Sequence, residues 1–216
     1  MDFARARHAM VESQVRTCDV TDARILNAMR TLGRERFAPA HKRAFAYADL
    51  ELEVAPGRTL MRPRDLAKLI QALGPRANER GLEIAGASGY GAAVLAACCA
   101  EVVAVDPDAT FSFAARAALE ASLVANVKTV ATATTHGWPD AAPYDLIMLN
   151  GAAEIVPDAW LAQLAPGGRL GVIVREGPVG RARIYTRAGD AVAYRIAFDA
   201  APPLAPGLAR PPSFRF

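Results

Sequence analysis

The sequence has few of the residues that form covalent frameworks, metal clusters or membrane spans. Its 216 residues include three cysteines, Cys18, Cys98 and Cys99, an odd number without a CxxC pair. That pattern argues against a disulfide framework and against a zinc site, and the scattered histidines have no metal-ligand spacing. No stretch approaches the ~20 apolar residues of a membrane helix, and the N-terminus lacks a signal-peptide core. We therefore expect a cytoplasmic protein without a bound metal or a membrane anchor.

The chain also has little excess of positive over negative charge. The formal net charge is +3, and the basic residues are interleaved with acidic ones rather than arranged with aromatics along a stripe. Nucleic-acid surfaces usually need such a stripe, so we expect no nucleic-acid partner. What the chain does have is apolar content, 52% of all residues, which is enough to form a sizeable core.

The apolar pattern divides the chain near residue 75. Residues 1–75 have helical spacing, with Pro63 in the first turn of one helix, and we expect an N-terminal helical region there. Residues 76–216 alternate strand and helix signals and end in a Gly-containing β-hairpin and a Pro-rich tail. Apolar runs separated by helices predict an α/β fold with a doubly wound, mostly parallel sheet. The expected strands are 82–85, 102–105, 128–131, 146–150, 170–174, 183–187 and 192–196, and the expected helices of this part are 92–99, 111–123 and 157–164.

One turn carries the strongest functional signal. The strand that contains Glu83 enters the small-residue turn Ala85–Gly91, which opens an Ala-rich helix, and the next strand ends at Asp106. Such a turn lets the backbone approach a nucleotide cofactor, and the second carboxylate can accept both ribose hydroxyls. The alternative is an ordinary strand-turn-helix whose small residues serve packing. A dinucleotide site is disfavoured because the turn lacks G-x-G-x-x-G.

Further segments extend this pattern, and their order and spacing resemble the protein-L-isoaspartate O-methyltransferase family over most of residues 8–175. The segments are 10–16, 34–37, 46–49, 57–63, 133–139, 144–157 and 163–170. The resemblance implies a Rossmann-like, S-adenosylmethionine-dependent methyltransferase fold. It also implies methyl esterification of isoaspartyl carboxylates in damaged proteins, with S-adenosylhomocysteine as product. The residues that it assigns to the cofactor are Glu83, Ala85, Gly86, Ser88, Gly89, Asp106 and Asn150.

The acceptor side is expected at residues 57–63, which match the family's Gly-x-Thr-Ile-Ser-x-Pro segment. Met61 stands at the serine position, so Thr59 and Met61 are the candidate catalytic residues. The resemblance places Leu60 beside the acceptor, and Arg58 and Arg62, which flank Met61, are candidates to bind an acidic substrate. An arginine fork can bind a carboxylate through two hydrogen bonds, although two solvated arginines are the plainer interpretation.

Three alanines mark departures from the family pattern. Ala85 and Ala87 stand at glycine positions of the turn, and each would be strained if its φ were positive. Ala133 lies in the region where the family has an adenine-binding aspartate. Two functions therefore stay open: an active carboxyl methyltransferase, or a degenerate member that has lost cofactor binding or catalysis. The degenerate member would act as a binding or regulatory protein, or on another acidic acceptor.

Overall fold

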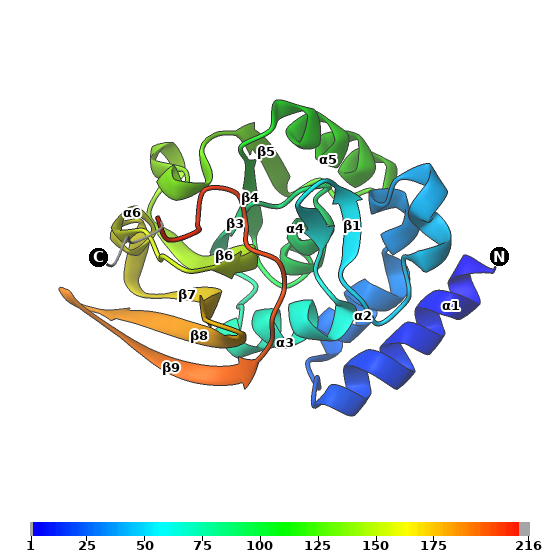
Figure 1. Cartoon of the computed structure of the whole chain (residues 1–216), viewed down its shortest axis with the longest axis horizontal. Coiled ribbons are helices and arrows are strands. Elements are labelled where there is room, and N and C mark those ends of the chain that lie inside the picture. Colours follow the sequence, from blue (N-terminus) through cyan, green and yellow to red (C-terminus); the bar gives the residue numbers. More distant parts are fainter. Residues whose placement is uncertain (1, 212–216) are drawn as a thin grey trace, which may run out of the picture.

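A seven-stranded sheet forms the centre of the computed structural model, which describes residues 2–211 (Figure 1). The strand order is β5-β4-β3-β6-β7-β8-β9. The bounds are β3 (Arg80–Ile84), β4 (Glu101–Asp106), β5 (Val127–Ala131), β6 (Tyr144–Ala153), β7 (Leu164–Glu176), β8 (Val179–Ala188) and β9 (Ala191–Asp199). The five strands from β5 to β7 in this order are parallel, and β8 is antiparallel to both β7 and β9. The predicted α/β class, parallel sheet and C-terminal hairpin are confirmed.

The strand order creates a switch point at β3. The chain runs outward from β3 to β4 and β5, and then returns to the other side of β3 to form β6. In open α/β sheets, ligands bind beyond the carboxyl ends of the strands at such a point. The turn after β3 therefore lies where the fold class places a binding site.

Helices cover the sheet on both faces. They are α1 (Phe3–Met10), α2 (Ala23–Thr31), α3 (Pro63–Leu73), α4 (Tyr90–Ala96), α5 (Ala109–Ala121) and α6 (Asp158–Ala162). Successive residues of a strand point to opposite faces. Met148 of β6 accordingly joins the cluster formed with α2, α3 and α4, whereas Ile147 joins the cluster around Trp160 of α6. The first cluster includes residues from both sides of residue 75, and the division into two regions there stays a prediction.

The N-terminal region is less regular than its helical pattern predicts. A π-helical turn, Val11–Val15, follows α1, and short 3-10 segments occupy Arg16–Cys18, Arg34–Phe37 and Ala40–Phe45. Two further 3-10 segments, Thr134–His136 and Pro139–Ala141, lie before β6. A two-stranded hairpin, β1 (Leu52–Ala55) and β2 (Arg58–Leu60), comes before α3. The sequence analysis did not predict this hairpin.

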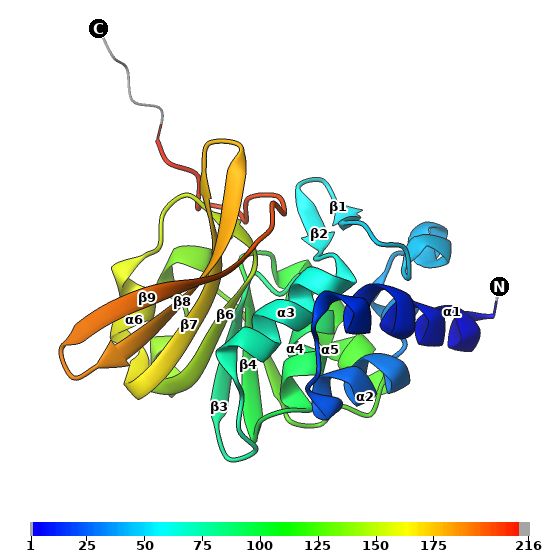
Figure 2. The ribbon, with the colours of Figure 1, turned by 90° about the horizontal axis from the view of Figure 1, so that it is seen from below.

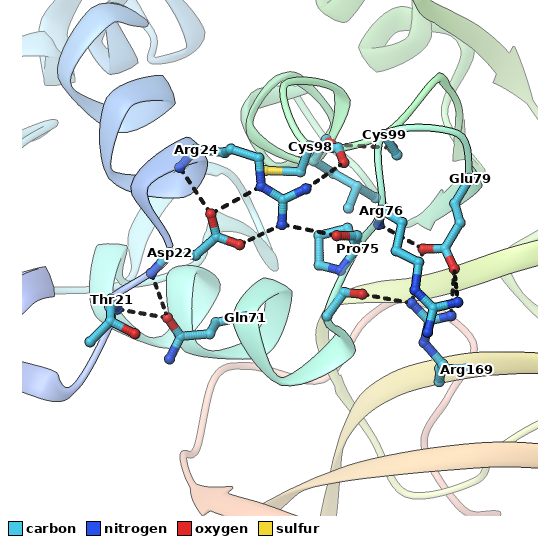
Figure 3. A network of polar contacts seen from close by, with 12 residues as sticks. Thr21, Asp22, Arg24, Gln71, Pro75, Arg76, Glu79, Cys98, Cys99 and Arg169 are labelled. Atoms are coloured by element: carbon cyan, nitrogen blue, oxygen red, sulfur yellow. Dashed lines mark hydrogen bonds and ion pairs between the residues drawn. The ribbon is translucent and has the colours of Figure 1, made fainter.

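A polar network joins the N-terminal helices to the sheet at the amino ends of the strands (Figure 3). Arg169 of β7 binds both oxygens of Glu79, at 2.7 and 2.9 Å, and also donates to the carbonyls of Leu73 and Gly74. Arg24 binds Asp22 and donates to the carbonyls of Cys98 and Pro75. Gln71 accepts from the backbone N–H groups of Thr21 and Asp22. Each guanidinium nitrogen of the two arginines therefore has an acceptor.

Two segments of the chain lie at the opposite, carboxyl edge of the sheet: the β1–β2 hairpin and the C-terminal segment after β9 (Figure 2). Leu204 pairs with Ala152 at the end of β6, and the N–H of Ala205 donates to the carbonyl of Ala152. Leu208 is buried, and its carbonyl accepts from the N–H of Glu154. The Pro-rich segment is therefore irregular but attached to the sheet, up to the last described residues.

Across residues 2–211, the three cysteines are free and no helix is long and apolar enough to cross a membrane. The same part of the chain has no cluster of three or more metal-ligating side chains.

Candidate functional site

The turn after β3 has a backbone conformation that favours glycine at two alanine positions. The φ angles are 57° at Ala85 and 47° at Ala87. A left-handed conformation costs an L-residue roughly 1–2 kcal/mol because its Cβ approaches the following carbonyl. Asn150 on β6 donates from Nδ2 to the carbonyl of Ala85 at 3.2 Å, which helps to hold this conformation.

The carboxyl of Glu83 is enclosed beneath that turn. A Cβ at Gly86 or at Gly91 would overlap its oxygens, so glycine at both positions leaves room for this carboxyl. Within the described residues neither oxygen has a hydrogen-bond partner. Burial raises the pKa of Glu83 to about 8, although the backbone N–H of Ala92 is close enough to oppose the rise. At pH 7 the group is therefore mostly neutral, and it gains from any donor or cation that reaches it.

The carboxylate of Asp106, at the end of β4, has four donors. Arg58 binds both oxygens through its two terminal nitrogens, with Nη1 at 2.9 Å from Oδ1. The backbone N–H of Ala87 donates to Oδ2 at 2.9 Å, and that of Asp108 donates to Oδ1 at 3.0 Å. Because a carboxylate offers about four acceptor positions, Asp106 is saturated by the chain itself.

The predicted cofactor residues lie together at the carboxyl ends of β3, β4 and β6. In this part of the fold, the buried Ser88 has a hydroxyl without a partner among residues 2–211. Gly89 has a φ of 87° and is the N-cap residue of α4. Their roles toward a cofactor stay predictions. Those assigned residues are Glu83, Ala85, Gly86, Ser88, Gly89, Asp106 and Asn150.

The predicted acceptor residues do not share one environment. Thr59 is half-buried on β2, whereas Leu60 and Met61 are buried in the larger hydrophobic cluster. The Met61 side chain therefore contributes to packing, and its carbonyl accepts from Nη2 of Arg34 at 2.7 Å. Arg62 donates from its backbone N–H to Glu51 at 2.9 Å, and its guanidinium lies 3.8 Å from Asp49. The charges of Arg58 and Arg62 therefore both face carboxylates of the same chain.

Two charged residues near this segment, the buried Arg34 and the half-buried Glu51, were not predicted. Arg34 is fully buried, and its guanidinium lies 4.7 Å from the ring centroid of Tyr90. Burial lowers the pKa of Arg34. Burial also raises the pKa of Glu51 to about 7, while the N–H of Arg62 opposes the rise. Arg34 belongs to the family-like run 34–37, but nothing in that run distinguishes a buried arginine from a surface one.

Two observations test whether the site suits S-adenosylmethionine. The Glu83 carboxyl is buried without a partner in residues 2–211, and a Cβ at Gly86 or Gly91 would overlap its oxygens. This arrangement suits a ligand that carries donors and positive charge. Asp106 is the residue predicted to hold a ribose, and both of its oxygens are bound by Arg58.

Comparison with known proteins places the chain in a family. Residues 5–196 match the family model of protein-L-isoaspartate(D-aspartate) O-methyltransferase. The chain is 42% identical over 179 residues to protein-L-isoaspartate O-methyltransferase of Methylorubrum populi, an alignment that covers 83% of this chain and 82% of that protein. It is 37% identical over 190 residues to protein-L-isoaspartate O-methyltransferase 2 of Marinobacter nauticus, covering 88% and 87%.

Solved structures agree in fold. A protein-L-isoaspartate O-methyltransferase superposes with a TM-score of 0.80 at 23% identity, over 94% of this chain and 66% of that one. A Plasmodium falciparum protein assigned to the same activity, solved in complex with S-adenosyl-L-homocysteine, superposes with a TM-score of 0.76 at 15% identity, over 92% and 97%. With the family match over residues 5–196, the resemblance found in the sequence is confirmed: the chain belongs to the protein-L-isoaspartate(D-aspartate) O-methyltransferase family.

Proposed function

We propose that the chain is an S-adenosylmethionine-dependent methyltransferase that esterifies isoaspartyl carboxylates in damaged proteins, in the cytoplasm. One observation carries the proposal. Two acidic residues, Glu83 and Asp106, flank a small-residue turn at the carboxyl ends of adjacent parallel strands, at the switch point of the sheet. In this fold class that position serves nucleotide-like ligands.

The residues at this point would bind and orient, and none needs to act as a nucleophile. S-adenosylmethionine, when bound, supplies a methyl group on a sulfonium centre. Glu83 and the backbone of the turn would hold the amino-acid end, Asp106 would accept the ribose hydroxyls, and Asn150 keeps the turn in place. Because the substrate carboxylate is itself the nucleophile, the chain contributes alignment and the exclusion of water.

The acceptor would lie beside residues 57–63. Thr59 has the hydroxyl that remains there, because Met61 is buried and has at most a weak acceptor. Arg62, partly exposed and only loosely paired with Asp49, is the better placed of the two arginines to meet an acidic acceptor.

A second candidate function is supported by the saturation of Asp106 and the burial of Met61. A family member that has lost catalysis would keep the fold and bind a partner or another acidic ligand through the same edge of the sheet. The two candidates differ in one measurable property, the affinity for the cofactor.

The first test is a calorimetric titration with S-adenosylhomocysteine, with methyl transfer to an isoaspartyl peptide measured in parallel. We expect binding and transfer, and we expect Asp106→Asn to weaken binding at least tenfold because a charged hydrogen-bond acceptor is lost. Glu101→Gln, at the exposed other end of β4, is the matched control and should leave binding unchanged. Absence of both binding and transfer at millimolar ligand would contradict the first function and favour the second.

A further inference from the structure

The side chain of Arg58 closes the cofactor side of the site from an element outside the main sheet. We propose that Arg58 is a latch: it holds the tip of the β1–β2 hairpin on Asp106 when the site is empty, and it competes with a diol-bearing ligand for that carboxylate. The inference rests on the proposed cofactor site and names the residue that regulates access to it.

The contact is built on two sides of the guanidinium. The two terminal nitrogens form a bidentate ion pair with Asp106. The guanidinium also lies over the ring of Phe111, with Cζ at 4.9 Å from the ring centroid. The Arg58 side chain is 9% exposed and that of Asp106 is 4% exposed. Breaking such a pair without replacing a partner leaves a buried charge uncompensated, so the closed arrangement is favoured until a ligand supplies the missing donors.

The number of hydrogen-bond acceptor positions on the Asp106 carboxylate makes the competition direct. Two of its four acceptor positions are used by the backbone N–H groups of Ala87 and Asp108, which belong to the turn and to the start of α5. The other two are used by Arg58. A vicinal diol donates two hydrogen bonds, so it needs the two positions that Arg58 occupies, and both cannot be bound at once.

The hairpin is buried at its base and exposed at its tip. Leu52 and Leu60 at the base are buried in the hydrophobic cluster. At the tip, Pro56 and Gly57 are exposed, and Arg58 is the buried residue next to them. The two strands form a sheet of their own, and an isolated two-stranded hairpin is marginally stable. The ion pair therefore makes a large contribution to holding the tip down.

The test measures S-adenosylhomocysteine affinity and backbone hydrogen exchange of residues 52–60 in the full chain. We expect Arg58→Met to bind at least tenfold more tightly than the wild type, because the ligand no longer has to displace a guanidinium. We also expect faster exchange of the hairpin in Arg58→Met without ligand, and in the wild type when the ligand is added. Arg58→Gln, which keeps an amide donor, provides the same comparison if Arg58→Met does not fold.

Lys42→Met is the matched control, because Lys42 pairs with Glu53 of the same hairpin at 3.0 Å in an exposed position. It should change neither affinity nor exchange. Wild-type binding equal to or tighter than that of the Arg58 variants would overturn the latch and leave the proposed cofactor site intact. If neither protein binds the ligand, the cofactor assignment fails and the latch, which rests on it, is overturned with it.

Discussion

Each of the two edges of the sheet, at the amino and the carboxyl ends of the strands, has an ion pair between an arginine and a carboxylate, but the surroundings of the two pairs differ. At the amino edge, Arg169 and Glu79 form a buried ion pair whose remaining donors reach the carbonyls at the end of α3. At the carboxyl edge, Arg58 and Asp106 also pair, but among the described residues the nearby Glu83 carboxyl has no partner, and the turn carries two alanines with positive φ. Among the described residues, the charged groups at the first edge are paired, whereas the second edge keeps unpaired polar groups and backbone strain. Strain of this kind gathers at functional sites.

We expect the largest loss of stability from a substitution at the amino edge of the sheet. Replacing Arg169 by Met leaves Glu79 buried without its main partner, and we expect a loss of about 3–5 kcal/mol in the free energy of unfolding. Burial alone would raise the pKa of Glu79, but its hydrogen bonds with Arg169 keep that pKa below its usual value. Urea denaturation measures the loss. Arg116→Met, which breaks an exposed pair with Glu120, should cost less than about 1 kcal/mol; equal losses would remove the contrast between the edges.

The next effect is the pH dependence of the stability that Glu83 contributes at the carboxyl edge of the sheet. The pKa of Glu83 is raised from 4.5 to about 8 in the folded chain. The folded state therefore holds a proton that the unfolded state releases above about pH 4.5. The stability from Glu83 is complete below that pH and is lost as the pH rises to about 8, by at most about 1.4 kcal/mol per pH unit.

Glu83→Gln tests this dependence of stability on pH, because glutamine keeps the shape of the neutral carboxyl and does not titrate. Thermal unfolding between pH 5 and pH 9 should show a flatter curve for Glu83→Gln and an unchanged curve for Glu120→Gln, a control on the exposed surface of α5. An unchanged slope in Glu83→Gln would mean that Glu83 is ionised and has found a partner.

The smallest effect concerns the turn. Ala85→Gly and Ala87→Gly remove the penalty of a positive φ, and we expect each to stabilise the chain by about 1 kcal/mol. Ala117→Gly in the middle of α5 is the control and should destabilise by about 1 kcal/mol, because its backbone is helical and gains nothing from glycine. Chemical denaturation of the three variants gives the comparison. Destabilisation by all three would show that the turn is relaxed.

The sequence predicted the elements that repeat a simple pattern. The parallel strands β3, β4 and β6 are buried on both faces, so they appear as continuous apolar runs, and Glu83 and Asp106 follow from the turn that joins them. The β1–β2 hairpin was missed because its strands have only four and three residues. The pairing of Arg58 with Asp106 joins positions 48 residues apart, and no local pattern predicts such a contact. The sequence analysis therefore located the carboxylates of the candidate site but not the residue that occupies one of them.

The C-terminal segment covers a part of the sheet that is synthesised earlier than the segment itself. Leu204 and Ala205 bind the end of β6, and Leu208 binds Glu154 just beyond it. The chain is synthesised from its N-terminus, and a domain generally folds as a unit. Strand β6 therefore leaves the ribosome before the segment that covers its end. During synthesis, the carboxyl end of β6 stays uncovered until residues 204–208 have also been made.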